Sequence, residues 1–307
     1  MVSELGLGCA RIGGIFQHNS NGFLNLLSAA RDSGINFFDT ADIYSQGESE
    51  TLIGRAFRRT RSRVVIATKA GYCLPARRRF AARLKPLLRP VIRSLGIRRD
   101  RLSAAARGVL TQNFSPDYLH KAVEASLRRL QTDYLDLLQL HSPPAEVVER
   151  GEWEPALEAL KRAGKIRYYG ISCDTIEVGR LALNYPGMSS LQFLLNLLER
   201  RNIDALLPEL RAKEVAGIAR ECLANGVLAK PVEEIDLARY YPTSEEQRHR
   251  AEQLADCRRQ AAERGTSLTR LALEFASRAE GVSVALIGAR TVEQLQSLLD
   301  AYLRAPR

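Results

Sequence analysis

Short apolar runs of strand length recur along the 307-residue chain, and segments with helical periodicity separate them. Most of these runs are bounded by glycine, charged or turn-forming residues, as buried strands are. Two weaker candidates have the same length but a less apolar composition. The stronger runs are 35–38, 64–67, 135–140, 166–171, 226–229 and 282–287, and the weaker ones are 5–8 and 190–193.

Helical periodicity is clearest in residues 117–130, which place Leu119, Val123, Leu127 and Leu130 on one face. Strand and helix candidates alternate over about 300 residues, and this order predicts a single (β/α)8 barrel domain spanning residues 1–307. A doubly wound parallel sheet is the alternative, but no GxGxxG motif follows a strand candidate. The other expected helices are 21–33, 48–58, 154–163, 176–183, 208–225, 245–264, 267–279 and 291–303.

The composition excludes several classes of protein. The chain is 45% hydrophobic and 26% charged, which is typical of a folded globular protein. No run approaches the roughly 18–20 apolar residues of a membrane-spanning helix, and the first residues lack the pattern of a signal peptide. The five cysteines are scattered without a CxxC motif, so we expect neither a metal site nor a disulfide framework. A reduced, cytoplasmic protein is therefore expected.

The positive charge is concentrated in one segment. The chain has 45 Lys and Arg against 35 Asp and Glu, a net charge of +10. Residues 74–107 hold eleven of these bases and one acid, Asp100, so the remainder has 34 of each and is neutral. This pattern does not suggest a nucleic-acid-binding protein. The segment is interpreted as a solvated insertion, a lid over an acidic substrate, or a docking site for an anionic membrane or an acidic partner.

Four reactive side chains follow consecutive strand candidates. Asp39 ends the second strand and Tyr44 lies in its loop, while Lys69 and His141 end the third and fourth strands. Because the C-terminal ends of barrel strands converge on one face, we expect these groups to lie together. A nearby lysine lowers the pKa of a phenol, and an aspartate holds that lysine charged. Such a tyrosine is suited to protonate a carbonyl oxygen while a hydride reaches the carbon, with the imidazole orienting the carbonyl.

Several sequence blocks resemble the aldo-keto reductase family, and they span residues from about 10 to 300. In that family the matching Asp, Tyr, Lys and His form a catalytic tetrad, which implies this role for Asp39, Tyr44, Lys69 and His141. The resemblance also implies a nicotinamide cofactor, usually NADPH and alternatively NADH, bound across the barrel mouth. The blocks are GINFFDTADIY (34–44), VVIATKAGY (64–72), SLRRLQTDYLDLLQLH (126–141), GKIRYYGISC (164–173) and VALIGARTVEQL (284–295).

The resemblance assigns positions along this cofactor. It implies that Ser172 and Gln192 bind the nicotinamide carboxamide, and that a group near the start of the last helix binds the adenine end. A guanidinium, a hydroxyl and free backbone N–H groups at a helix start are suited to a phosphate. Lys230 takes the place of an aromatic residue that commonly ends the seventh strand, and it is expected near the pyrophosphate or ribose. The adenine-end residues are Gly288, Arg290, Thr291 and Gln294.

Three positions depart from the family pattern and leave alternatives open. Cys173 replaces the usual asparagine after Ser172, Lys230 replaces the aromatic residue, and the last helix lacks the usual Glu-Asn pair. The expected substrate is a small carbonyl compound or alcohol, and the similarity is greatest to bacterial sugar-dehydrogenase-like members. A Schiff-base aldolase using Lys69 is disfavoured, because Asp39 would keep that lysine charged. A regulatory or scaffold protein that binds the cofactor with little turnover remains the alternative of another class.

Overall fold

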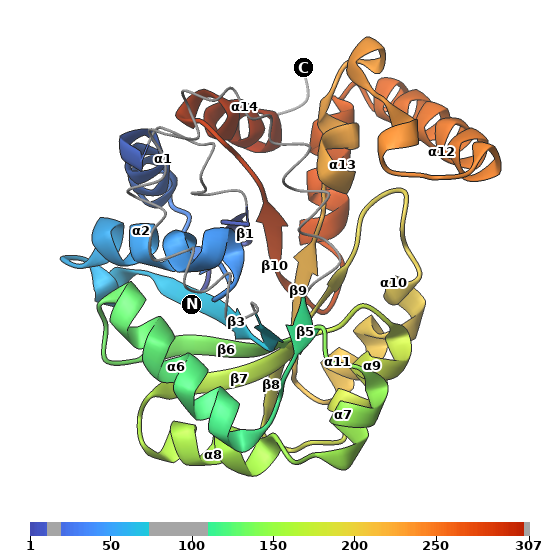
Figure 1. Ribbon diagram of the computed structural model, residues 1–307. Helices are drawn as coiled ribbons and strands as arrows, with labels where there is room; N and C mark the ends of the chain where they lie inside the picture. The colour runs from blue at the N-terminus through green and yellow to red at the C-terminus, as the bar shows by residue number, and fades with distance from the viewer. Residues whose placement is uncertain (11–19, 74–109, 304–307) are drawn as a thin grey trace, which may run out of the picture.

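Parallel strands form a closed barrel in the computed structural model, which describes residues 1–10, 20–73 and 110–303 (Figure 1). Around the barrel the strands follow the order β1-β10-β9-β8-β7-β6-β3-β2. This arrangement confirms the predicted (β/α)8 barrel. The strands are β1 (Leu5–Gly8), β2 (Phe37–Asp39), β3 (Val65–Ala70), β6 (Leu135–His141), β7 (Ile166–Ser172), β8 (Met188–Leu194), β9 (Ala216–Arg220) and β10 (Val282–Ile287).

Helices surround the strands, and α12 extends away from the barrel wall (Figure 1). The predicted face of α6 is buried, with Pro116 at its first position and Gln131 ending it in a left-handed conformation. No helix within the described ranges is long and apolar enough to cross a membrane. The helices are α1 (Ser20–Asp32), α2 (Glu48–Phe57), α6 (Pro116–Leu130), α7 (Ala145–Arg150), α8 (Glu154–Arg162), α9 (Ile176–Ala182), α10 (Asn202–Ala205), α11 (Leu207–Ala212), α12 (Ser244–Glu263), α13 (Leu268–Ser277) and α14 (Val292–Leu303).

Apolar residues fill the space on both sides of the strands. The larger core lies between the barrel and its helices and includes Leu26, Phe38, Ile53 and Leu138. A smaller cluster forms a separate core with residues from five of the barrel strands, and alternation along each strand separates the two sets. The polar residues that end the strands, such as Asp39 and His141, lie toward the C-terminal ends of the strands from this cluster. The smaller cluster consists of Phe37, Ala67, Leu137, Ile218, Val284 and Leu286.

The seventh barrel strand differs from the sequence prediction. The expected strand at 226–229 is part of a 3₁₀ segment, η3 (Ala224–Ala229), in which Asn225 and Gly226 have φ angles of 58° and 98°. A strand does not tolerate two consecutive left-handed residues. The true strand, β9, lies inside the stretch 208–225 that was expected to be helical. That helix ends as α11, and Glu214 at φ 54° redirects the chain into β9.

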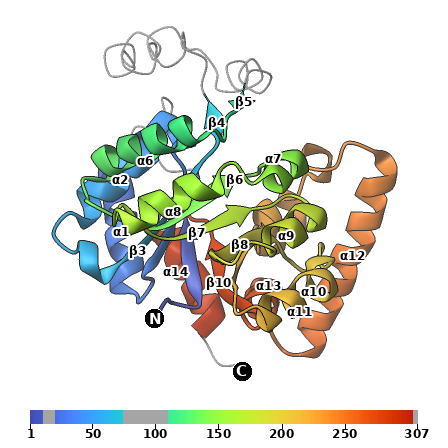
Figure 2. The same ribbon diagram turned by 90° about the horizontal axis from the view of Figure 1, so that it is seen from below.

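A two-stranded hairpin stands at the C-terminal end of β3. β4 (Tyr72–Cys73) pairs in antiparallel fashion with β5 (Thr111–Gln112), and both lie beyond the end of the barrel near α6 (Figure 2). The basic segment 74–107 connects these two strands and lies outside the described residues. In chain order the segment lies between β3 and α6.

Candidate active site

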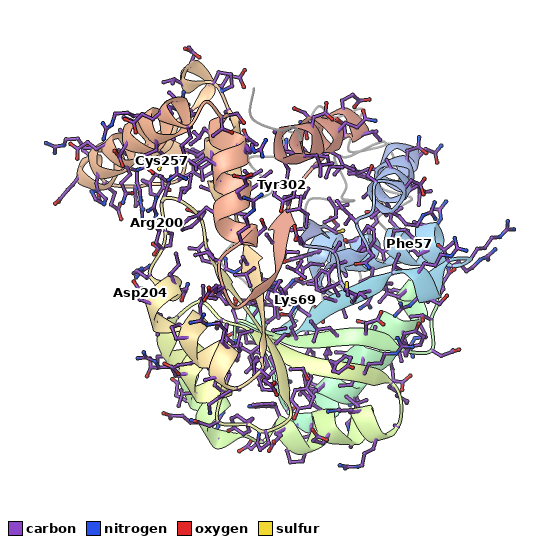
Figure 3. All side chains as sticks on the ribbon, turned by 180° about the vertical axis from the view of Figure 1, so that it is seen from behind. Phe57, Lys69, Arg200, Asp204, Cys257 and Tyr302 are labelled. Carbon is purple, nitrogen blue, oxygen red and sulfur yellow. The ribbon has the colours of Figure 1, made fainter. Side chains whose placement is uncertain are left out.

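Two neighbouring strands bring a carboxylate and an ammonium group together inside the barrel. Asp39 ends β2, Lys69 is the next-to-last residue of β3, and both are buried. Lys69 Nζ donates to Asp39 Oδ1 at 2.6 Å, to Asp39 Oδ2 at 2.7 Å and to the carbonyl oxygen of Thr40 at 3.0 Å. Figure 3 shows Lys69 among the strands near the middle of the barrel. The charged form of this lysine is therefore fully supplied with acceptors.

The loop after β2 folds back and carries Tyr44. Tyr44 begins the 3₁₀ segment η1 (Tyr44–Gly47), and Gly47 has a φ angle of 88°. A Cβ atom at Gly47 would lie 2.7 Å from Cδ of Arg129, so both the backbone angle and the space favour glycine. The turn brings the Tyr44 ring to 5.3 Å from Lys69 Nζ.

Burial and charge act in opposite directions on the acidity of Tyr44. Burial has the larger effect and raises the pKa of the Tyr44 phenol, while the Lys69 ammonium lowers it. Burial alone would lower the pKa of Lys69, but Asp39 and Tyr44 outweigh it and that pKa is raised. The sequence indicated that a nearby Lys69 lowers this pKa, and its effect has that sign. Burial is the larger effect, so the pKa of Tyr44 is raised.

The fourth member of the predicted group, His141, ends β6. Its ring lies edge-on to Tyr44 at a centroid distance of 5.8 Å and edge-on to Tyr72 at 4.8 Å. Burial, followed by the charges of Lys69 and Arg220, lowers the pKa of His141 to about 3. His141 Nδ1 is buried and lacks a hydrogen-bond partner within the described part of the chain. The imidazole is therefore neutral near pH 7 and has an unused polar atom.

Asp39 accepts hydrogen bonds from two amide side chains as well as from Lys69. Gln192 Nε2 on β8 lies 2.8 Å from Asp39 Oδ1, and Gln139 Nε2 on β6 lies 3.5 Å from the same oxygen. Gln139 was not predicted from the sequence. Strand periodicity contained a signal for it, because positions 139 and 141 of one strand share a face. Both amides donate to the same oxygen, so they hold the Asp39 carboxylate in place together with Lys69.

Comparison with known proteins identifies the family to which this geometry belongs. The model of the family described as "Aldo/keto reductase family" matches residues 4–305, nearly the whole chain. The chain belongs to the aldo/keto reductase family. It is therefore an NAD(P)H-dependent oxidoreductase, as the members of this family are.

Individual relatives agree with this assignment. The uncharacterized oxidoreductase YqkF of Bacillus subtilis is 30% identical over 309 residues, which cover 98% of this chain and 87% of YqkF. An aldo-keto reductase of Bacillus halodurans in its holo form superposes with a TM-score of 0.78 at 28% identity, covering 100% of this chain and 88% of that one. An aldo-keto reductase of Klebsiella pneumoniae in complex with NADPH has a TM-score of 0.66 at 25% identity, with 99% and 88% covered.

The residues expected at the nicotinamide carboxamide of this aldo/keto reductase are adjacent. Ser172 on β7 pairs in register with Gln192 on β8, and both side chains are buried. The neighbouring Cys173 is also buried, and its thiol lies 3.5 Å from the carbonyl oxygen of Gln192. Burial raises the pKa of Cys173 to about 12, so it remains a protonated thiol. The strand register thus brings a hydroxyl and an amide side by side next to His141.

The residues expected at the adenine end surround the start of α14. Thr291 Oγ1 accepts a hydrogen bond from the Gln294 backbone N–H at 3.2 Å, and Gln294 Oε1 accepts one from the Arg290 backbone N–H at 2.9 Å. A Cβ atom added at Gly288 would meet no atom of the described residues within 4 Å. A helix start and a guanidinium fit a phosphate-bearing nucleotide.

Lys230 does not end the seventh strand, and the residue at that position is Arg220. Lys230 follows η3 and is exposed. Arg220 ends β9, where its guanidinium donates to Glu221 Oε1 at 2.7 Å and to Asp174 Oδ1 at 2.6 Å. Its charge also lowers the pKa of His141, as described above. Arg220 was not predicted as a site residue, because the helix expected at 208–225 covered the true strand.

Proposed function

We propose that this aldo/keto reductase interconverts an aldehyde or ketone with an alcohol, and that Tyr44 is the general acid and base. The observation that carries the proposal is the position of the Tyr44 ring, 5.3 Å from Lys69 Nζ, which is itself bound to both oxygens of Asp39. A bound nicotinamide nucleotide supplies or accepts the hydride. The side chains provide the proton and the electrostatic field, which are the other requirements of carbonyl reduction.

Each member of the group has a defined task in this proposal. The positive charge of Lys69 stabilises negative charge on the Tyr44 oxygen as the phenol loses its proton. Asp39 holds Lys69 in its charged form. His141, being neutral, donates one N–H to the carbonyl oxygen and orients it toward the Tyr44 hydroxyl. The carbonyl oxygen is then held between two donors, the Tyr44 hydroxyl and the His141 imidazole, and it receives its proton from Tyr44.

The cofactor proposed for the reaction is NADPH, with NADH as the alternative. Support comes from the Klebsiella pneumoniae relative, which is described in complex with NADPH. We assign Ser172 and Gln192 to the carboxamide. The bond to Asp39 uses one of the two N–H donors of Gln192 Nε2, so a second N–H and the side-chain oxygen remain for this task. The residues assigned to the phosphates and the adenine end are Lys230, Gly288, Arg290, Thr291 and Gln294.

The state of Lys69 argues against a Schiff-base aldolase on the same barrel. Such an enzyme needs a neutral lysine as nucleophile. Here the charge of Asp39 raises the pKa of Lys69 against the opposing effect of burial, and all three N–H donors have acceptors. Borohydride trapping with a carbonyl substrate is therefore expected to leave Lys69 unmodified.

The test is the substitution Tyr44→Phe, which removes the acid and keeps the ring. With NADPH and a panel of aldehydes and ketones, loss of reduced-cofactor absorbance should fall by about 10²–10⁴-fold. Binding of NADPH, followed by fluorescence, should be retained. Tyr168→Phe is the matched control, because Tyr168 is 57% exposed and lies outside the group around Lys69. Retention of more than a tenth of the rate in Tyr44→Phe would remove Tyr44 from the mechanism, and binding without turnover in the unaltered protein would favour a regulatory role.

A further inference from the structure

A second carboxylate lies in the short loop between Asp39 and Tyr44. The backbone N–H of Asp42 donates to the carbonyl oxygen of Lys69 at 3.0 Å, which fixes this residue directly behind the catalytic strand ends. Asp42 Oδ1 is buried and has no hydrogen-bond partner in the described ranges. Asp42 Oδ2 accepts a hydrogen bond from the Tyr118 hydroxyl at 3.3 Å. Asp42 as a whole is half-buried, and among the described residues Tyr118 is the only side chain that donates to its carboxylate.

The charged neighbours of Asp42, Glu50 and Arg129, do not neutralise the negative charge of its carboxylate. Glu50 on α2 is fully buried and already accepts hydrogen bonds from Thr68 Oγ1 and Arg129 Nε, each at 2.6 Å. Arg129 on α6 is therefore engaged with Glu50 and acts on Asp42 only through space. Burial, and after it the charge of Glu50, raises the pKa of Asp42 to about 7, with Arg129 and Tyr118 opposing. The group can change its charge within the working range of most enzymes.

Tyr118 connects Asp42 to the hairpin at the barrel mouth. Its hydroxyl lies 3.2 Å from the carbonyl oxygen of Tyr72 on β4 as well as 3.3 Å from Asp42 Oδ2. Burial and the charge of Asp42 raise the pKa of Tyr118, and the nearby Cys73 thiol acts in the same direction, so the phenol stays protonated. A phenol has only one proton to donate. Asp42 and Tyr72 therefore compete for the same hydrogen bond.

The hairpin that Tyr118 contacts forms one wall beside His141. The Tyr72 ring packs edge-on against the His141 ring at 4.8 Å. On the paired strand, Gln112 Nε2 donates to the carbonyl oxygens of His141 at 3.3 Å and Ser142 at 2.8 Å. Both strands of the hairpin therefore contact His141, β4 through the Tyr72 ring and β5 through the Gln112 side chain.

We propose that Asp42 is a positioning residue which, by gaining or losing one proton, switches the Tyr118 hydroxyl between two acceptors and so sets how firmly Tyr72 holds His141. Neutral Asp42 donates its proton to the Tyr118 oxygen, and Tyr118 then donates to the carbonyl oxygen of Tyr72. Ionised Asp42 accepts the Tyr118 proton itself, and the Tyr72 carbonyl loses its donor. This inference rests on the proposed function, because His141 acts on the carbonyl substrate.

The proposal predicts a specific pH dependence. When Asp42 is neutral, Tyr72 holds His141 firmly and His141 orients the carbonyl substrate. The KM for the carbonyl substrate should therefore rise as the pH increases through about 7 and Asp42 loses its proton. The hydrogen bond between the Tyr118 hydroxyl and the Tyr72 carbonyl joins uncharged groups, and gaining or losing such a bond shifts a binding equilibrium by about two- to tenfold. KM should change by that factor, with a smaller effect on kcat. His141 cannot produce this inflection, because burial and the charges of Lys69 and Arg220 lower its pKa to about 3.

The experiment measures KM and kcat from pH 5.5 to 8.5 in the unaltered enzyme and three variants. Asp42→Asn keeps a neutral donor toward Tyr118, so it should retain the low KM at all pH values. Tyr118→Phe removes the connection and should have the high KM throughout. Asp117→Asn is the matched control, since it removes an exposed acid next to Tyr118 and should keep the inflection. Persistence of the inflection in Asp42→Asn, or its absence from both the unaltered enzyme and Asp117→Asn, would overturn the proposal.

A second measurement separates this proposal from the proposed function. Aspartate side-chain carboxyl signals are followed by ¹³C NMR, together with the ring signals of His141, without any substrate. A carboxyl that titrates near pH 7, disappears in Asp42→Asn and shifts the His141 signals supports the switch even if no carbonyl compound is reduced. If Asp42 titrates near pH 4 while Tyr44-dependent reduction is intact, the proposed function stands and the switch is rejected.

Discussion

Asp39 and Lys69 form an ion pair inside the barrel, with Lys69 Nζ 2.6 Å from Asp39 Oδ1 and the two side chains only 6% and 1% exposed. Removing one partner from a buried pair leaves an uncompensated charge, which costs far more than the pair itself contributes to stability. Gln192 donates to the same carboxylate and further fixes its position. The Asp39–Lys69 pair therefore matters both for the stability of the barrel and for the proposed proton transfer by Tyr44.

The first prediction concerns the stability that depends on this pair. Lys69→Met leaves Asp39 without its main partner and should lower the free energy of unfolding by about 3–5 kcal/mol at neutral pH. The double variant with Asp39→Asn removes the orphaned charge and should recover part of this loss. Urea unfolding followed by circular dichroism measures both values. Equal destabilisation of the single and double variants would show that lost packing, rather than charge, decides the outcome.

The second prediction concerns the charge of His141. Because burial, Lys69 and Arg220 lower the pKa of His141 to about 3, its ring ¹⁵N signals should not change between pH 5 and 8. The same histidine in urea-unfolded protein should titrate near ~6.5. Arg220→Met removes one of the positive charges and should raise the pKa of His141 without moving it into the neutral range. Titration of His141 in the folded protein above pH 5 would contradict the proposed role of a neutral imidazole.

The sequence predicted the barrel well because most strands and helices have an unambiguous period. The helix of residues 117–130 is confirmed within one residue as α6. The seventh strand was misplaced because β9, with the sequence AGIAR, contains small residues and follows a helix without a glycine or proline between them. The apolar residues Val227 and Leu228 are buried instead in η3. Local hydrophobicity alone does not distinguish a buried strand from a buried turn.

The candidate site was predictable to the extent that its residues end strands. Asp39, Lys69 and His141 were placed together because parallel strands of a barrel share one catalytic face. The contributions of Arg220 and Asp42 were not predictable, since both depend on which side chains meet across different elements. The net direction of the Tyr44 pKa also requires the extent of burial, which a sequence does not contain.

The third prediction concerns cofactor preference. If the Arg290 guanidinium contacts the 2′-phosphate, Arg290→Ala should weaken NADPH much more than NADH. A charge-assisted hydrogen bond contributes about 1.5–3 kcal/mol, which corresponds to roughly a ten- to hundredfold change in Kd. Fluorescence titration with both nucleotides measures the change. Arg264→Ala, an exposed arginine at the end of α12, serves as the control and should leave both affinities unchanged. Equal losses for the two nucleotides in Arg290→Ala would place Arg290 away from the 2′-phosphate.

The last prediction links Asp42 to the pH dependence of stability. Burial, together with the charge of Glu50, raises the pKa of Asp42 to about 7 in the fold, whereas an aspartate in the unfolded chain has a pKa near ~3.9. A raised carboxyl pKa means that its stability contribution is complete below the unfolded value and is lost as the pH rises through the folded one. Asp42→Asn removes this loss, so its unfolding free energy relative to the unaltered protein should increase by roughly 2–3 kcal/mol between pH 5 and 8. Urea unfolding at the two pH values measures the difference, and Asp117→Asn should show no such increase. A difference that is the same at both pH values would mean that Asp42 is already ionised at pH 5, and both this prediction and the proposed switch would fail together.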